Sequence, residues 1–115
     1  LKWSMFDSPD KLGSGKYFME SEPVFILDEA FRKERISGFI LRGYLSKNYA
    51  DKIGIPSNSG HRVGKSIKFK CINKAKRLRM IRGLIQYGIE RINVSNEWIY
   101  FDTDNYLKDQ EFVLF

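Results

Sequence analysis

The sequence predicts an α+β domain in which a small, mainly antiparallel sheet packs against helices. Residues 65 to 72 alternate apolar and polar side chains, as a strand with one buried face does. Residues 74 to 87 carry apolar side chains at helical spacing, and Asn73 before them is a favourable N-cap. The stripe that this helix is expected to bury consists of Leu78, Ile81, Leu84 and Ile85. Gly88 is expected to end it.

Shorter signals predict the remaining elements. Residues 89 to 94 and 98 to 102 flank a Ser-Asn turn, which predicts a hairpin. Residues 39 to 41 predict a buried strand, and residues 112 to 115 can add a terminal edge strand.

Polar caps predict two short helices. Ser46 is placed to cap a helix that Gly54 ends. Asp28 gives a weaker cap signal for a helix immediately after it. Ile55 to Gly60 is a turn-rich loop that leads to His61.

The first 22 residues differ from the rest of the chain. Ser, Gly, Pro and Asp interrupt them repeatedly, yet they contain more aromatic and Met side chains than a disordered tail usually does. They predict an extended arm that packs on its own domain or on a neighbouring subunit. Residues 23 to 115 are expected to form a single domain.

Composition sets the broad class. The 115 residues are 43% hydrophobic and 30% charged, which suits one soluble domain, and no apolar run approaches the roughly 18 residues that span a bilayer. No membrane association is therefore expected. Cys71 is the one cysteine, so no internal disulfide is possible. The net charge of +6 favours acidic partners.

Three stretches of the chain together form one recognisable pattern. Residues 42 to 48 read Arg-Gly-Tyr-Leu-Ser-Lys-Asn, and residues 97 to 104 read Glu-Trp-Ile-Tyr-Phe-Asp-Thr-Asp. Residues 57 to 71 lie between them and contain Asn58, Ser59, His61, Gly64 and Lys68. Together these resemble the zinc D-alanyl-D-alanine carboxypeptidases and the related phage endolysin peptidases, over residues 36 to 115. The resemblance implies a peptidase-like fold with a catalytic zinc.

The residues at the ligand positions do not suit zinc. The resemblance places His61, Lys68 and Tyr100 at the three ligand positions, with Asp102 two residues further on and Glu97 as a vestigial general base. A catalytic zinc needs three protein ligands and an open position for water. A protonated lysine has no lone pair, and a phenol with a pKa of about 10 is a poor ligand at neutral pH. We therefore expect a vestigial metal pocket, with no metal, no cofactor and no catalytic residue.

The substrate site that the resemblance implies is also altered. Leu45 occupies the position of the family's substrate-binding arginine, and Ser59 remains at the other vestigial position. We expect Lys68 to point into the old metal site and to pair with Glu97 or Asp102. Ordinary roles remain open for the same residues: a hydrogen-bonded loop histidine, a solvated lysine, packing in a strand or on the short helix, and a turn carboxylate.

A basic stretch lies between residues 62 and 82. It contains Arg62, Lys65, Lys68, Lys70, Lys74, Lys76, Arg77, Arg79 and Arg82. Clusters of this kind bind phosphates, but nucleic-acid-binding surfaces usually add stacking aromatic rings on the same face, and the sequence shows no such interleaving. Nucleic acid is therefore not expected as a partner. A charged helix exterior or a docking surface for an acidic partner is expected instead.

The sequence-based expectation is a pseudoenzyme. A non-catalytic structural or docking protein of a phage virion, in the tail or capsid, would bind other virion proteins or copies of itself through the N-terminal arm. Two alternatives remain. One is a module that binds peptidoglycan without cutting it. The other is an active peptidoglycan peptidase, in the bacterial cytoplasm or at the wall during lysis, that binds zinc through a shifted set such as His61, Glu97 and Asp102.

Overall fold

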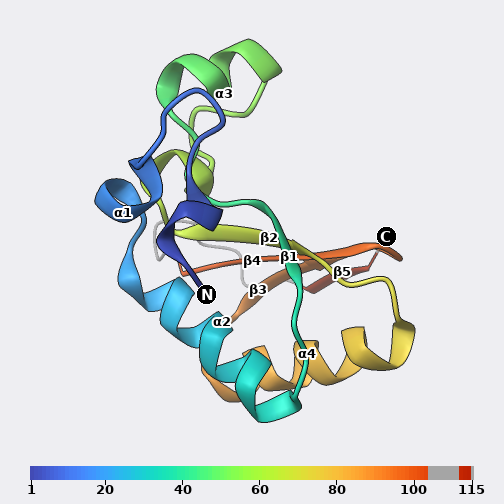
Figure 1. Ribbon diagram of the computed structural model, residues 1–115. Coiled ribbons are helices and arrows are strands. Elements are labelled where there is room, and N and C mark those ends of the chain that lie inside the picture. The colour runs from blue at the N-terminus through green and yellow to red at the C-terminus, as the bar shows by residue number, and fades with distance from the viewer. Residues whose placement is uncertain (104–111, 115) are drawn as a thin grey trace.

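A five-stranded sheet with the strand order β1-β2-β4-β3-β5 forms the centre of the fold (Figure 1). The computed structural model describes residues 1–103 and 112–114. The strands are β1 (Phe39–Arg42), β2 (Ser66–Lys70), β3 (Arg91–Val94), β4 (Trp98–Asp102) and β5 (Phe112–Leu114). The pairs β1–β2, β2–β4 and β3–β4 are antiparallel, while β5 lies parallel to β3 at the edge. The predicted small, mainly antiparallel sheet is confirmed, as is its terminal edge strand.

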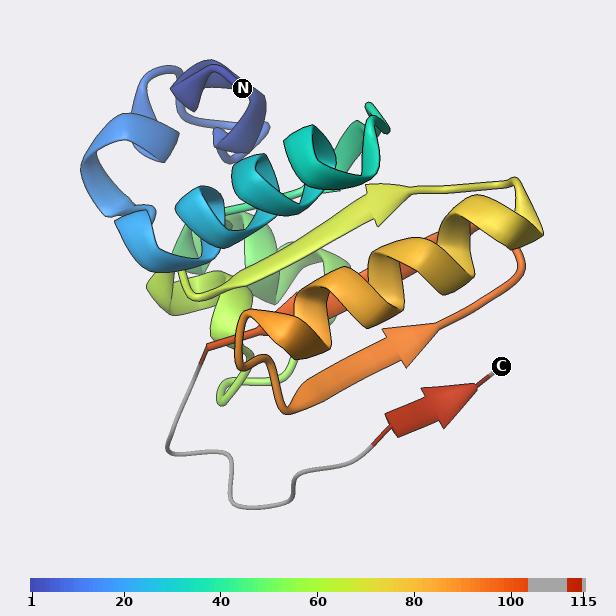
Figure 2. The same ribbon diagram turned by 90° about the horizontal axis from the view of Figure 1, so that it is seen from below.

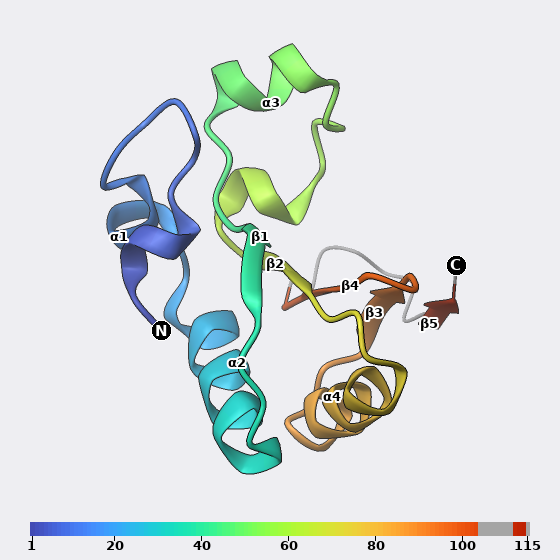
Figure 3. The ribbon, with the colours of Figure 1, turned by 45° about the vertical axis from the view of Figure 1, so that its right-hand side comes forward.

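Helices cover one face of this sheet. The α-helices are α1 (Ser14–Phe18), α2 (Ser21–Glu34), α3 (Lys47–Ile53) and α4 (Lys74–Gln86), and the 3-10 helices are η1 (Trp3–Phe6) and η2 (Gly60–Val63). Figure 2 shows α2 and α4 lying across the same side of the sheet, whereas α3 and η2 lie away from them in Figure 3. The predicted α+β class is confirmed. Within the described ranges, no helix combines the length and apolar character needed to cross a membrane.

The core lies between the sheet and the pair α2 and α4. Its strand residues alternate as predicted, because every second side chain of a strand points to the same face. The fully buried members include Ile67, Phe69, Ile99 and Phe101 from the sheet, and Leu27, Ala30, Met80 and Leu84 from the helices. The Phe31 and Phe69 rings meet edge to face with centroids 5.3 Å apart. Burial of each large side chain contributes about 1.5–3 kcal/mol.

The buried stripe of α4 differs from the predicted one. Met80 and Leu84 are completely buried, but Leu78 and Ile85 remain 59% and 46% exposed. The helix is turned so that Gly83 faces Ala30 on α2, which brings the line through residues 80, 83 and 84 against the core. The prediction of Leu78 and Ile85 as core residues is therefore wrong, since α2 and the sheet together select a different side of the helix.

The predicted caps are mostly confirmed. The Ser46 hydroxyl accepts a hydrogen bond from Tyr49 N at 3.2 Å, and the Asn73 side chain accepts one from Lys76 N at 3.0 Å. Gly54 ends α3 with φ of 79°. Asp28, in contrast, caps nothing, because α2 begins at Ser21 and Asp28 lies inside it.

The N-terminal segment is not an extended arm. Residues 1 to 22 form η1, α1 and the start of α2, so the predicted boundary after residue 22 falls inside a helix. Phe6 is completely buried in the core, and its carbonyl accepts a hydrogen bond from Tyr44 N at 2.9 Å. The Asp7 carboxylate accepts hydrogen bonds from Gly13 N and Gly15 N at 3.0 and 2.8 Å. Side-chain oxygens thus accept hydrogen bonds from backbone N–H groups of this segment. Its turn-forming residues had predicted an irregular backbone here.

If the N-terminal segment is part of the core, truncating Phe6 must destabilise the whole domain. We expect Phe6→Ala to lower the free energy of unfolding by about 3–5 kcal/mol, because it leaves a cavity. Phe25→Ala is the control, since Phe25 on α2 is 61% exposed. Urea unfolding followed by circular dichroism measures both. Equal, small effects would show that the segment contributes little to the core.

Candidate functional site

The face of the sheet away from α2 and α4 is polar. In the β2–β4 ladder, Lys68 pairs with Tyr100 and Ser66 pairs with Asp102, and in the β3–β4 ladder Arg91 pairs with Asp102. Paired residues of neighbouring strands share a face, and so do residues two apart along one strand. The register therefore gathers these side chains on one surface, with the apolar residues between them facing the core.

A cleft of about 300 Å³ opens over this polar face. Its lining consists of Arg42, Ile55, Pro56, Asn58, Ser59, Gly60, His61, Lys68, Arg91, Asn93, Trp98 and Tyr100. The structure thus brings together His61, Lys68, Tyr100 and Ser59, which the sequence analysis had grouped. Asp102 is not among the lining residues, but its carboxylate accepts a hydrogen bond from the lining residue Tyr100.

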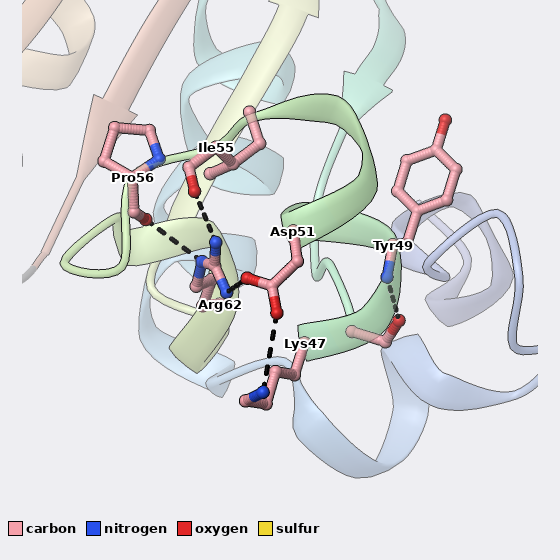
Figure 4. Close-up of polar contacts among 7 residues, drawn as sticks. Lys47, Tyr49, Asp51, Ile55, Pro56 and Arg62 are labelled. Carbon is pink, nitrogen blue, oxygen red and sulfur yellow. Dashed lines mark hydrogen bonds and ion pairs between the residues drawn. The ribbon is translucent and has the colours of Figure 1, made fainter.

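The loop that carries His61 is held in place by Arg62. The Arg62 guanidinium binds the Asp51 carboxylate on α3 at 2.7 Å and donates to the Pro56 carbonyl at 3.0 Å (Figure 4). It also donates to the Ile55 carbonyl. One side chain therefore ties α3 and the start of the loop that follows it to η2, which fixes the wall of the cleft.

Two glycines allow the loop to sit this close to its neighbours. A Cβ at Gly60 would overlap the Ser66 hydroxyl on β2. Gly64 has φ of 72°, and a Cβ there would overlap the Phe18 carbonyl of α1. Glu20 N donates to the Gly64 carbonyl at 2.9 Å. The turn before β2 therefore needs glycine both for its left-handed conformation and for its contact with the N-terminal segment.

His61 is a buried, neutral histidine. Its side chain is only 4% exposed, and Nδ1 donates to the Gly43 carbonyl at 2.8 Å, which places the lone pair on Nε2. Burial lowers the pKa of His61 to about 4, and the nearby charges of Arg42 and Lys68 act in the same direction. Its ring meets the Tyr100 ring edge to face at 5.4 Å.

Tyr100 belongs to a closed hydrogen-bond network. Its hydroxyl donates to the Asp102 carboxylate at 2.6 Å, so the Ser66 hydroxyl, 2.9 Å away, donates to Tyr100. Arg91 Nε donates to the same Asp102 oxygen at 3.2 Å. Burial, and then the negative charge of Asp102, raise the pKa of Tyr100 far above its ordinary value. The residue at the third expected ligand position is therefore a protonated phenol.

Lys68 does not form the expected ion pair. Its ammonium lies over the Trp98 ring, 4.3 Å from the centroid, and among the described residues it pairs with neither Glu97 nor Asp102. That prediction was wrong because Asp102 lies further along β4, opposite Ser66, where Tyr100 and Arg91 engage it. Partial burial, and then the charge of Arg42, lower the pKa of Lys68.

The other two predicted positions have backbone roles. Leu45 is 2% exposed, and its N–H donates to the His61 carbonyl at 3.0 Å. Glu97 has an exposed side chain in the turn before β4 and is not among the residues that line the cleft. Its backbone carbonyl accepts a hydrogen bond from Cys71 N at 2.7 Å. Neither side chain is placed to act on a ligand in the cleft.

The donor set of the cleft does not suit zinc. In residues 1–103 and 112–114, no group of three or more His, Cys, Asp or Glu side chains is arranged to hold a metal ion. The cleft presents cations instead, namely Arg42, Lys68 and Arg91. Sequence analysis missed Arg42, Arg91, Asn93 and Trp98 as lining residues. The alternation of β3 and β4 already indicated that Arg91, Asn93 and Trp98 point away from the core.

Comparison with family models, curated proteins and solved structures gives no match to this chain.

The lowered pKa of His61 predicts a defined pH dependence of stability. The unfolded chain binds a proton near pH 6.5, whereas the folded chain resists it until about pH 4. Stability is therefore lost as pH falls through this window, by up to about 3 kcal/mol from this one group. We expect His61→Asn, which can keep a donor for the Gly43 carbonyl, to flatten this part of the profile. Urea unfolding at about pH 7 and about pH 4.5 measures it. Parallel profiles for both proteins would contradict the assignment.

Proposed function

We propose that this chain is a non-catalytic structural or docking protein built on a zinc-peptidase-like fold of the D-alanyl-D-alanine carboxypeptidase type, and that it works in a phage virion. One observation carries the proposal. The side chains at the second and third expected ligand positions are committed elsewhere, Lys68 to the Trp98 ring and Tyr100 to Asp102 and Ser66.

The chemistry of these two residues supports a loss of catalysis. A lysine ammonium offers only donors, and a phenol with a raised pKa keeps its proton at neutral pH. His61 alone among the expected ligands retains a suitable lone pair. A zinc-bound water would also need a general base, and the exposed Glu97 lies outside the cleft. The arrangement keeps the shape of a binding cleft while its donors no longer match a divalent cation.

The surface of the N-terminal segment supports a docking role. Leu12 is 96% exposed and Tyr17 is 79% exposed, and Phe18 beside them is 46% exposed. Exposed apolar side chains gathered on one segment are typical of protein interaction sites. The proposed partners are other virion proteins or further copies of this chain, which would cover α1 and the loop before it.

Restoring the ligands tests the proposed origin of the cleft. We expect the double variant Lys68→Asp with Tyr100→His to retain about one zinc ion per chain after dialysis, since His61 would complete a set of three ligands. The matched control is Lys70→Asp with Trp98→His, the next pair on the same face of that ladder. Metal analysis by mass spectrometry measures the bound zinc. Equal zinc in both double variants would contradict the proposal.

The wild-type chain provides the second arm of this experiment. We expect it to release no new amino or carboxyl termini from purified cell walls and to hold no stoichiometric zinc. Sedimentation with intact walls separates a virion docking protein, which stays in solution, from a module that binds peptidoglycan. Release of new termini by the wild-type chain would overturn the non-catalytic assignment.

A further inference from the structure

Aromatic rings and cations interleave on the polar face of the sheet. The ladders place Lys70 between Phe39 and Trp98, and in the next row Lys68 lies between Arg42 and Tyr100. We call this surface the basic sheet face, which consists of Phe39, Arg42, Lys68, Lys70, Trp98 and Tyr100. The sequence analysis found no such interleaving because the rings and the cations lie on different strands. The register removes that argument against nucleic acid.

The cations of this face have no counter-ion among the residues that the structure describes. Among residues 1–103 and 112–114, Arg42, Lys68 and Lys70 form no ion pair, although Arg42 and Lys68 are direct neighbours across β1 and β2. Several other arginines of the chain do have carboxylate partners, namely Arg32, Arg62, Arg82 and Arg91. Partial burial, and then the charge of Arg42, lower the pKa of Lys68. Adjacent like charges without partners produce a local positive potential that an anionic ligand would neutralise.

One aromatic ring of the face is open to a flat ligand. Phe39 is 71% exposed on the edge strand β1. Trp98 is half-buried, with the Lys68 ammonium over one side of its ring. Aromatic side chains on an open sheet surface stack with the bases of unpaired nucleic acids, while neighbouring cations contact the phosphates.

We propose that the basic sheet face binds single-stranded nucleic acid, with bases against Phe39 and Trp98 and phosphates against Arg42, Lys68 and Lys70. A single carboxylate or phosphate would use the cleft alone and would leave Lys70 and Phe39 without a role. A strand covers both rows of the face and matches a chain of net charge +6. This inference goes beyond the proposed docking role and does not depend on the origin of the cleft.

The electrostatic arm of the test compares two triple variants. Labelled oligo-dT and oligo-U of about ten nucleotides are titrated with the whole chain, since such sites span roughly 4–16 nucleotides. We expect Arg42→Gln with Lys68→Gln and Lys70→Gln to weaken binding at least tenfold and to reduce the salt slope by about 2. The matched control replaces the exposed Lys16, Lys52 and Lys74 by Gln, which changes the net charge equally away from the face. The two oligonucleotides distinguish DNA from RNA as the ligand.

The aromatic arm tests stacking apart from charge. Trp98→Leu and Phe39→Leu are each expected to weaken binding about fivefold or more, because a stacked base contributes about 1–3 kcal/mol. Phe25→Leu, on the helical side of the molecule, is the control. The chain has two tryptophans, so a Trp3→Phe background isolates the emission of Trp98, which the oligonucleotide should quench.

Four results would overturn the proposal. These are no binding at about 50 mM salt, equal losses in the two triple variants, unchanged affinity in both aromatic variants, and equal competition by a poly-glutamate peptide of the same charge. Thermal melting of every variant confirms that it is folded. If Arg42→Gln unfolds the chain, the pair Lys68→Gln with Lys70→Gln replaces the triple variant, with an expected slope change of about 1.4.

Discussion

The antiparallel pairing of β2 with β4 determines the character of both faces of the sheet. Its register runs from Ser66 opposite Asp102 to Lys70 opposite Trp98. A slip of β2 by one residue would turn Ile67 and Phe69 toward solvent and would bury Lys68. The β2–β4 register therefore places both the apolar side chains of the core and the polar side chains of the cleft. A change of this register would alter the core and the cleft together.

The polar side chains at the base of the cleft have hydrogen-bond partners. At its rim, Arg42 and Lys68 have no carboxylate partner among the described residues. At its base, Asp102 is 3% exposed and its charge is held by the Tyr100 hydroxyl and by Arg91. In the described ranges, every buried side-chain nitrogen and oxygen has a hydrogen-bond partner. Charged networks of this kind are strong in a low-dielectric interior when every member is satisfied. At the rim, where these two cations form no ion pair with the described residues, the Lys68 ammonium contacts the Trp98 ring.

Local signals predicted most of the elements but not how they pack. Asn73 and Ser46 predicted their helices because a cap acts within one turn of the chain. The strand alternation of residues 66–70 and 91–94 likewise predicted their buried sides. The orientation of α4 depends on its contact with α2, which no pattern within the helix encodes, and Leu78 was misplaced for that reason.

The same limit applied to the site. The family resemblance had grouped residues 59, 61, 68 and 100, which line one cleft. It was not enough to predict what Lys68 contacts, because Trp98 reaches it only through the ladder. The burial of Phe6 was missed since its partner Tyr44 lies 38 residues away in the sequence, and turn-forming residues surround it.

The irregularity in β1 limits how the sheet can grow. The pairing with β2 shifts between Ile40 and Arg42, and the intervening Leu41 is exposed. A strand from another molecule that approached this rim would find its hydrogen-bonding groups out of step after two residues. Open-ended stacking of copies through the β1 edge is thereby disfavoured.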